Sequence, residues 1–168
     1  MEFSVGDKVV HPKHGFGRIF GLEQLDVVEG FNRYYVIEIP DQGLTVHVPV
    51  RNVDALGVRP IMSRFKLSQV LDVLRDSPQS LPDDYRERQA WVRERLETGD
   101  PLRIAGIVRD LIWYERRAHL TEADSALLGR GREFLASEIA LVTDTEIADA
   151  NELINKALVA ATAKQPDS

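Results

Sequence analysis

The sequence has no cysteine among its 168 residues, and aromatic residues make up only 7% of it. The absence of cysteine excludes disulfide bonds and cysteine-based metal sites, and it fits a reducing compartment. No apolar run reaches the roughly 18 residues that a membrane-spanning helix needs, so we expect no membrane segment. The first residues also lack a basic stretch followed by an apolar run, so we expect no signal peptide and a cytoplasmic protein.

The chain also lacks an excess of positive charge, because its formal net charge is −6 at pH 7. This balance argues against a protein that binds nucleic acid through bulk charge. The charge is uneven, however. Between Arg86 and Arg117, eight arginines stand against six acidic residues, whereas from Glu122 onward four basic residues stand against nine acidic ones. A local positive surface on an acidic protein is compatible with this pattern.

No arrangement of residues in the sequence is typical of a catalytic site. His11, His14 and His47 are the candidate metal ligands, but no carboxylate is spaced near them, and we interpret His11 and His47 as polar positions on strands. The segment Gly15–Gly17 is too short for a phosphate-binding loop and opens no helix. No serine lies in a nucleophile elbow. We therefore expect no enzyme, no metal site and no cofactor.

The first 58 residues have the alternation and turn residues of β-structure. We expect Gly15 and Gly17 to take positive φ angles in one turn, with further turns at Glu29–Gly30 and Asp41–Gly43. Short strands with glycine turns predict a small, strongly bent sheet or a Tudor/SH3-like β-barrel domain over residues 1–58. The expected strands are Lys8–His11, Arg18–Val28, Arg33–Ile39 and Leu44–Val48.

The rest of the chain has the periodicity of helices, and each expected helix has a recognisable start. Pro82 is placed in the first turn of one helix, followed by Asp83–Asp84, and Asp100–Pro101 starts the next. Thr121–Asp124 resembles a capping box, and Thr143–Glu146 repeats that signal. We therefore predict an α+β protein of two domains, with the β-barrel followed by an all-α five-helix domain over 63–162 and a frayed tail over 163–168.

The helix that follows Pro82 carries two aromatic residues among arginines. Trp91 lies near Arg88 and Arg95 on a helical wheel. It either packs against a neighbouring helix or domain, or it is available for stacking on nucleic acid while arginine neutralises phosphates. Tyr85 either caps the helical core or protrudes at the start of the helix, close to Arg86 and Arg88.

Several short motifs are spread over nearly the whole chain. They are Phe3–Gly15, Leu44–Pro49, Gly57–Arg59, Val73–Arg75, Gly99–Asp100, Ala105, Val108–Leu111 and Ser137–Ala140. With these motifs the chain resembles the CarD/CdnL family of bacterial transcription regulators. The N-terminal motif is shared with the polymerase-binding module of transcription-repair coupling factors, and the helical motifs favour CarD/CdnL.

The resemblance implies that a Tudor-like barrel docks on the β subunit of RNA polymerase. Docking in the family is by strand addition, in which backbone hydrogen bonds supply affinity and alternate side chains supply specificity. The matching strands are Leu22–Val28 and Leu44–Val48. The residues expected to contact polymerase are therefore Leu25, Val27, Thr45, Val46 and His47. His47 stands where arginine is common in the family, and Leu25 where a basic residue can occur.

The resemblance also implies that the helical domain contacts promoter DNA upstream of the melted region. A family tryptophan wedges into the minor groove there and slows collapse of the transcription bubble. Tyr85 occupies that position in this chain, and Glu87 and Ala90 stand where positive residues are usual. The residues expected to contact DNA are Tyr85, Arg86, Arg88, Trp91, Arg130 and Arg132.

A different function remains open from the sequence. The weak basic character of the helical part favours a protein-only module that joins RNA polymerase to another protein, without a DNA wedge. In both interpretations we expect a monomer that acts by binding.

Overall fold

The computed structural model describes residues 2–164 of the chain. It divides into two compact units between Ile61 and Met62, called here the sheet unit and the helical unit. Of the frayed tail expected over 163–168, residues 163 and 164 belong to the last helix. Residues 165–168 lie outside the described residues.

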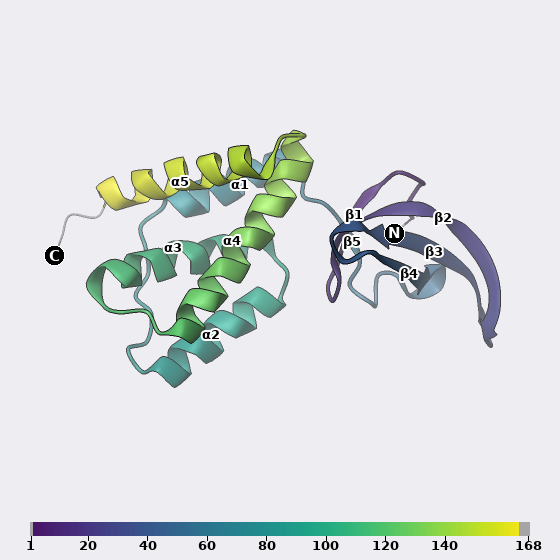
Figure 1. Ribbon diagram of the computed structural model, residues 1–168, viewed down its shortest axis with the longest axis horizontal. Coiled ribbons are helices and arrows are strands. Elements are labelled where there is room, and N and C mark those ends of the chain that lie inside the picture. The colour runs from purple at the N-terminus through teal and green to yellow at the C-terminus, as the bar shows by residue number, and fades with distance from the viewer. Residues whose placement is uncertain (1, 165–168) are drawn as a thin grey trace. The chain divides into compact units, whose positions relative to one another are not determined.

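The sheet unit is built on one five-stranded antiparallel sheet with the strand order β4-β3-β2-β1-β5. The strands β4 and β5 lie at the two ends of this order, so within residues 2–164 the sheet is bent but does not close into the expected barrel (Figure 1). The expected fold class, a β-domain followed by helices, is confirmed. The strands are β1 (Lys8–His11), β2 (Gly15–Val28), β3 (Phe31–Ile39), β4 (Leu44–Pro49) and β5 (Arg59–Pro60), with short 3-10 helices η1 (Pro40–Gln42) and η2 (Val50–Asn52) on either side of β4.

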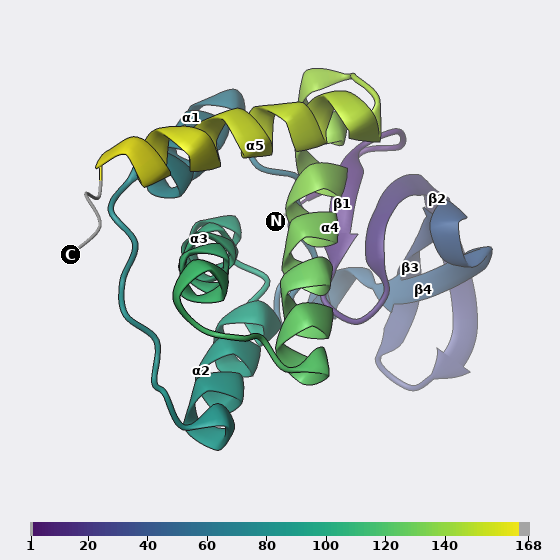
Figure 2. The same ribbon diagram turned by 60° about the vertical axis from the view of Figure 1, so that its left-hand side comes forward.

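A β-bulge in β2 divides the sheet into a buried part and an exposed part. The pairing with β3 shifts between Ile19 and Gly21, so Phe20 is the extra residue. Ile19 is buried in the core of the sheet unit, whereas Phe20 is 64% exposed. A bulge of this kind bends the strand and raises its local twist. The 14-residue strand β2 therefore leaves the core after Ile19 and continues as a curved ribbon with β3 (Figure 2).

Two glycines of the first hairpin have different structural roles. Gly15 has a φ angle of +92°, as expected for a tight turn. The expectation of a positive φ for Gly17 is wrong, because Gly17 lies within β2 opposite Val9. Position 17 requires glycine for a steric reason, because a Cβ atom there would lie 2.6 Å from the carbonyl oxygen of Glu38.

The helical unit consists of five helices whose starts mostly follow the expected local signals. Asp100 caps α3 with Pro101 at the first helical position. Thr121 and Asp124 form a complete capping box at the start of α4. The second helix begins later than predicted: Pro82 lies outside it, and Asp84 is its cap. The helices are α1 (Arg64–Arg75), α2 (Tyr85–Glu97), α3 (Pro101–Arg117), α4 (Glu122–Thr143) and α5 (Ile147–Lys164).

Helices α1 and α5 run side by side in both views, and α4 crosses the unit between them and α2 (Figures 1 and 2). The close approach of α4 to its neighbours requires a small residue at Gly131, where a Cβ atom would lie 2.9 Å from Cγ2 of Val108. Within residues 2–164, no helix is long and apolar enough to cross a bilayer.

The steric role of Gly17 generates a testable prediction. We expect Gly17→Ala to lower the free energy of unfolding of the sheet unit by about 1–3 kcal/mol, because the added methyl group overpacks the core. Its three nearest atoms would lie 2.6–2.9 Å away, on Glu38, Ile39 and Ile37. Urea denaturation followed by circular dichroism measures the change.

The matched control is Gly21→Ala in the same strand, where no atom lies within 4 Å of the added Cβ and φ is not positive. We expect this control to leave stability unchanged or slightly raised. Equal effects of the two substitutions would contradict the steric explanation.

Candidate functional site

Tyr85 is the first residue of α2 and is 50% exposed. The carboxylate of Asp84 caps the helix by accepting hydrogen bonds from the backbone N–H groups of Arg86 (2.8 Å) and Glu87 (3.2 Å). Val92, two helical turns after Tyr85, is fully buried. Of the two alternatives for Tyr85, a core cap and a protruding ring, the exposure favours the protruding ring.

The ring of Tyr85 is associated with a positive charge at the surface. Nε of Arg86 donates a hydrogen bond to the Tyr85 hydroxyl at 3.0 Å, and the guanidinium carbon lies 5.5 Å from the ring centroid. The start of α2 therefore presents an aromatic ring beside a cation. This pairing suits a ligand with flat apolar surfaces and negative groups.

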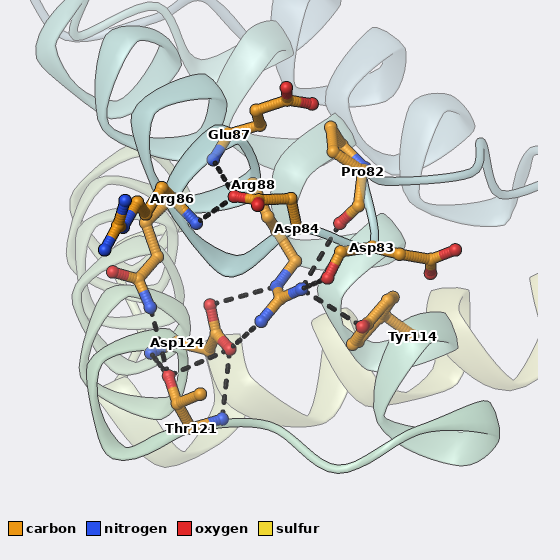
Figure 3. Close-up of polar contacts among 10 residues, drawn as sticks. Pro82, Asp83, Asp84, Arg86, Glu87, Arg88, Tyr114, Thr121 and Asp124 are labelled. Atoms are coloured by element: carbon orange, nitrogen blue, oxygen red, sulfur yellow. Dashed lines mark hydrogen bonds and ion pairs between the residues drawn. The ribbon is translucent and has the colours of Figure 1, made fainter.

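Arg88, predicted to contact DNA, is 2% exposed, and this burial argues against that contact. Its guanidinium group forms a two-pronged ion pair with Asp124, with Nε at 3.2 Å from Oδ1 and Nη2 at 2.8 Å from Oδ2. Its Nη1 donates to the carbonyl oxygens of Pro82 and Asp83 and to the Tyr114 hydroxyl (Figure 3). These bonds direct the Arg88 side chain into the helical unit, where it does not face a phosphate group at the surface.

The ion pair is held in its charged form. The hydrogen bond from Arg88 to Asp124 raises the pKa of the arginine, in opposition to burial. Burial tends to raise the pKa of Asp124, but the hydrogen bonds from Arg88 and Thr121 outweigh it, so this pKa is lowered. Both groups are therefore ionised across the neutral range.

A second buried ion pair holds the segment between α1 and α2. Arg109 donates from Nε to Asp110 at 2.9 Å and from Nη1 to the carbonyl oxygen of Val73 at 3.0 Å. The carboxylate of Asp110 also accepts from the backbone N–H of Gln79 at 2.9 Å. This pair was not predicted from the sequence. An Arg-Asp dipeptide in an otherwise apolar helical stripe is the signal that could have indicated it.

Trp91 is 42% exposed and is associated with Arg95, not with Arg88. The guanidinium carbon of Arg95 lies 3.3 Å from the centroid of the Trp91 ring, and its Nη1 donates to the Trp91 carbonyl at 3.2 Å. The indole is therefore stacked with a cation at the surface. This exposure favours the interpretation of Trp91 as available for stacking.

The two arginines predicted on α4 have different environments. Arg130 is exposed, whereas Arg132 is half-buried and donates from Nη2 to Oδ1 of Asn155 on α5 at 2.7 Å. Gly131 between them faces the core. Arg132 therefore contributes to the packing of α4 and α5 as well as to the surface charge.

In the sheet unit, three of the five predicted contact residues lie on a strand at the edge of the sheet. Thr45 and His47 are exposed on β4, and Val46 is half-buried against the core. Nε2 of His47 lies 3.1 Å from Oε2 of Glu23 on β2. Because β4 pairs with β3 on one side only, alternate backbone groups of β4 face outward.

The other two predicted contact residues lie on the exposed ribbon of β2. Leu25 is half-buried and Val27 is 74% exposed. The pairing of β2 with β3 is irregular between Gln24 and Val28, which includes both positions. The structure therefore places the five residues on two separate strands, β2 and β4.

The histidines considered as metal ligands do not come together as a site. His11 and His14 have ring centroids 4.7 Å apart, but Nδ1 of His11 accepts hydrogen bonds from the backbone N–H groups of Lys13 and His14. Burial lowers the pKa of His11, and the charges of His14 and Lys13 lower it further. His47 lies on β4, and no metal-binding group of three or more ligands occurs within the described residues.

Two family models match this chain, and together they cover most of it. The CarD-like/TRCF RID domain matches residues 3–62, and the CarD C-terminal domain matches residues 69–155. The chain belongs to the CarD-like family of transcription regulators. The resemblance stated from the sequence is thereby confirmed. The CarD-like family interacts with the transcription machinery and is not a known class of enzymes.

Similar proteins include a named relative and a solved structure. The chain is 28% identical over 142 residues to YdeB of Bacillus subtilis (strain 168), which is named as a candidate transcription factor; the match covers 83% of this chain and 92% of the relative. It is also 30% identical to the 72-residue N-terminal domain of Myxococcus xanthus CarD, solved by NMR in solution. That match covers 35% of this chain and 79% of the domain, with a TM-score of 0.31.

The ion pair of Arg88 and Asp124 generates a prediction about pH. Because the pKa of Asp124 is lower in the folded chain than in the unfolded chain, the unfolded chain takes up the proton first as the pH falls. The contribution of Asp124 to stability is therefore complete above the ordinary aspartate pKa of about 3.9 and decreases below it, toward the lowered value. We expect Asp124→Asn to lower the free energy of unfolding by about 3 kcal/mol at neutral pH. The variant should also show a weaker dependence of stability on pH below the ordinary aspartate pKa.

Urea denaturation at a series of pH values from neutral to acid measures both effects. The control is Asp72→Asn, which removes a carboxylate from an exposed pair with Arg75 at 3.2 Å. This control should change stability by less than about 1 kcal/mol. An Asp124→Asn variant with the acid profile of the unmodified chain would contradict the assignment.

Proposed function

We propose that this protein docks on the β subunit of RNA polymerase through the sheet unit and stabilises the promoter open complex through the helical unit. The observation that carries the proposal is the exposed Tyr85 beside Arg86, in a chain that belongs to the CarD-like family. The protein acts by binding in the cytoplasm, as a monomer and without a cofactor.

The edge strand β4 supports the docking step. Strand addition needs an edge with unpaired backbone groups and side chains that contact the partner at alternate positions. Thr45 and His47 are two residues apart on β4 and both are exposed. Leu25 and Val27 on β2 extend the contact in this proposal. The five residues expected from the resemblance thus form the proposed polymerase-binding set.

The start of α2 supports the DNA-contacting step. A ring that inserts between base steps must protrude and must be next to a positive charge that tolerates the phosphates. Tyr85 with Arg86 meets both conditions, whereas Arg88 is removed from the set. Trp91, Arg130 and Arg132 complete the proposed DNA-contacting surface upstream of the melted region.

Tethering explains how an acidic protein can act on DNA. A helical unit joined to a polymerase-bound sheet unit is present near the promoter at a high effective concentration, so weak contacts suffice. The contacts shift the equilibrium only if they are stronger in the open complex than in the closed one. Insertion of Tyr85 at the edge of the melted DNA supplies this difference.

The wedge is tested by Tyr85→Ala. We expect the lifetime of the open complex to fall by about five- to tenfold, because an aromatic–base stack contributes roughly 1–3 kcal/mol. Tyr85→Trp should lengthen the lifetime, since indole has the larger stacking area. The measurement is the decay of competitor-resistant complexes formed by RNA polymerase on a promoter, with the protein at saturation.

Phe65→Ala is the matched control, because Phe65 is an aromatic residue of the same unit that is 74% exposed on α1. It should leave the lifetime unchanged. If Tyr85→Ala, although folded, gives the same lifetime as the unmodified protein, the wedge proposal is wrong.

The docking strand is tested by Thr45→Glu combined with His47→Glu. We expect the affinity for the isolated β-subunit fragment to fall by about tenfold or more, which corresponds to ~1.4 kcal/mol, because the new charges disturb the proposed interface. Ala55→Glu introduces one such charge at an exposed loop position and should bind normally. Normal binding by the double variant would place the docking surface elsewhere.

A protein-only module is the second candidate. It is favoured by the burial of Arg88 and by the exposure of Glu87 and Glu94 on α2. In this case the helical unit recruits another protein to the polymerase. A footprint on promoter DNA that appears only with polymerase present, and that Tyr85→Ala removes, separates the first candidate from the second.

A further inference from the structure

One arginine holds the backbone that leads into Tyr85. The side chain of Arg88 donates to the carbonyl oxygens of Pro82 at 3.2 Å and Asp83 at 2.9 Å. The backbone N–H of Arg88 donates to the carbonyl oxygen of Asp84 at 3.0 Å. The three successive carbonyl groups immediately before Tyr85 therefore all accept hydrogen bonds from one residue, Arg88.

The start of α2 is also fixed relative to α4. Oδ2 of Asp124 accepts a hydrogen bond from Nη2 of Arg88. It also accepts from the backbone N–H and from the hydroxyl of Thr121, both at 3.0 Å. Nε2 of Gln89 donates to the Thr121 hydroxyl at 3.1 Å. The carboxylate that completes the cap of α4 is thus the same one that holds Arg88.

The ring of Tyr85 is fixed only weakly by its own packing, because half of the residue is exposed and its hydroxyl bonds to the exposed Arg86. Its position must therefore come mainly from the backbone on either side. A wedge has to meet one base step, and a displacement of about 1 Å is enough to weaken a site that depends on geometry.

We propose that Arg88 and Asp124 are positioning residues for Tyr85, which set the direction in which the ring leaves the helical unit. This inference rests on the proposed function of Tyr85 as a wedge. Neither residue contacts DNA. Arginine is required at position 88 because a planar guanidinium group can reach a carboxylate and three other acceptors at once, whereas the single ammonium group of lysine cannot.

The test uses the second buried pair as a control for lost stability. Arg88→Lys and Arg109→Lys each keep a positive charge and disturb a buried Arg–Asp pair, at 2% and 7% exposure. Arg109 holds Val73 and its neighbour Asp110 holds Gln79, which is six residues before Tyr85, so this pair does not bind the three carbonyl groups immediately before Tyr85. Both full-length variants are assayed with RNA polymerase and promoter DNA, at a temperature where denaturation curves show them folded.

We expect Arg88→Lys to shorten the open-complex lifetime at saturation by about fivefold, because it loses hydrogen bonds made by a charged group, while Arg109→Lys changes it by less than about twofold. Binding to the isolated β-subunit fragment should not change, because docking belongs to the sheet unit. In a Tyr85→Ala background, Arg88→Lys should have no further effect. A general loss of stability would not produce this dependence on Tyr85.

Each failure has a separate outcome. If Tyr85→Ala alone has no effect on the lifetime, the proposed function fails. If Tyr85→Ala shortens the lifetime but Arg88→Lys matches Arg109→Lys, the positioning role is wrong. It is also wrong if Arg88→Lys shortens the lifetime equally with and without Tyr85.

A second variant and a second measurement cover the case in which Arg88→Lys does not fold. Asp124→Asn keeps the shape of the carboxylate and one acceptor, and it is tested in the same pair of backgrounds. Incorporated 3-fluorotyrosine gives a direct readout, with the Tyr85 resonance assigned by Tyr85→Phe. We expect Asp124→Asn to shift or broaden this ¹⁹F resonance, and Asp72→Asn to leave it unchanged. A Tyr85 resonance unaffected by Asp124→Asn would overturn the inference.

Discussion

A buried guanidinium group needs hydrogen-bond acceptors for its N–H groups and a negative charge beside it, and the arrangement around Arg88 follows from this requirement. An unpaired charge in the interior of a protein costs several kcal/mol. The partners come from three places in the chain: the turn before α2, Tyr114 on α3 and Asp124 on α4. The positions of α2, α3 and α4 are consequently linked through one side chain. Such a pair adds little net stability compared with apolar packing, but it admits few alternative arrangements.

The features that the sequence predicted well are those determined within a few residues. The starts of α3 and α4 follow from Asp100 and from the capping box at Thr121, because a cap bonds to backbone groups two or three residues away. Arg88 could not be placed in this way, since Asp124 is 36 residues distant. The spacing of Arg88 and Val92, one turn apart, does place both on the buried side of α2. The open edge of the sheet likewise depends on strand order, which no local pattern contains.

Burial also changes the electrostatic description of the helical unit. Between Arg86 and Arg117 the sequence has eight arginines and six acidic residues, but Arg88, Arg109 and Asp110 are buried. Six arginines and five acidic residues remain, so this part of the surface is close to neutral. Recognition by this unit must therefore depend on the shape and placement of single side chains more than on a basic field.

The short edge strand has a consequence for solubility. An unpaired strand is a template on which further copies of a chain can assemble into fibrils. β4 has only six residues, lies between η1 and η2, and ends at Pro49, which has no N–H group to continue a ladder. The edge therefore has room for one short partner strand and is interrupted at both ends. A surface of this length allows specific pairing while it opposes open-ended aggregation.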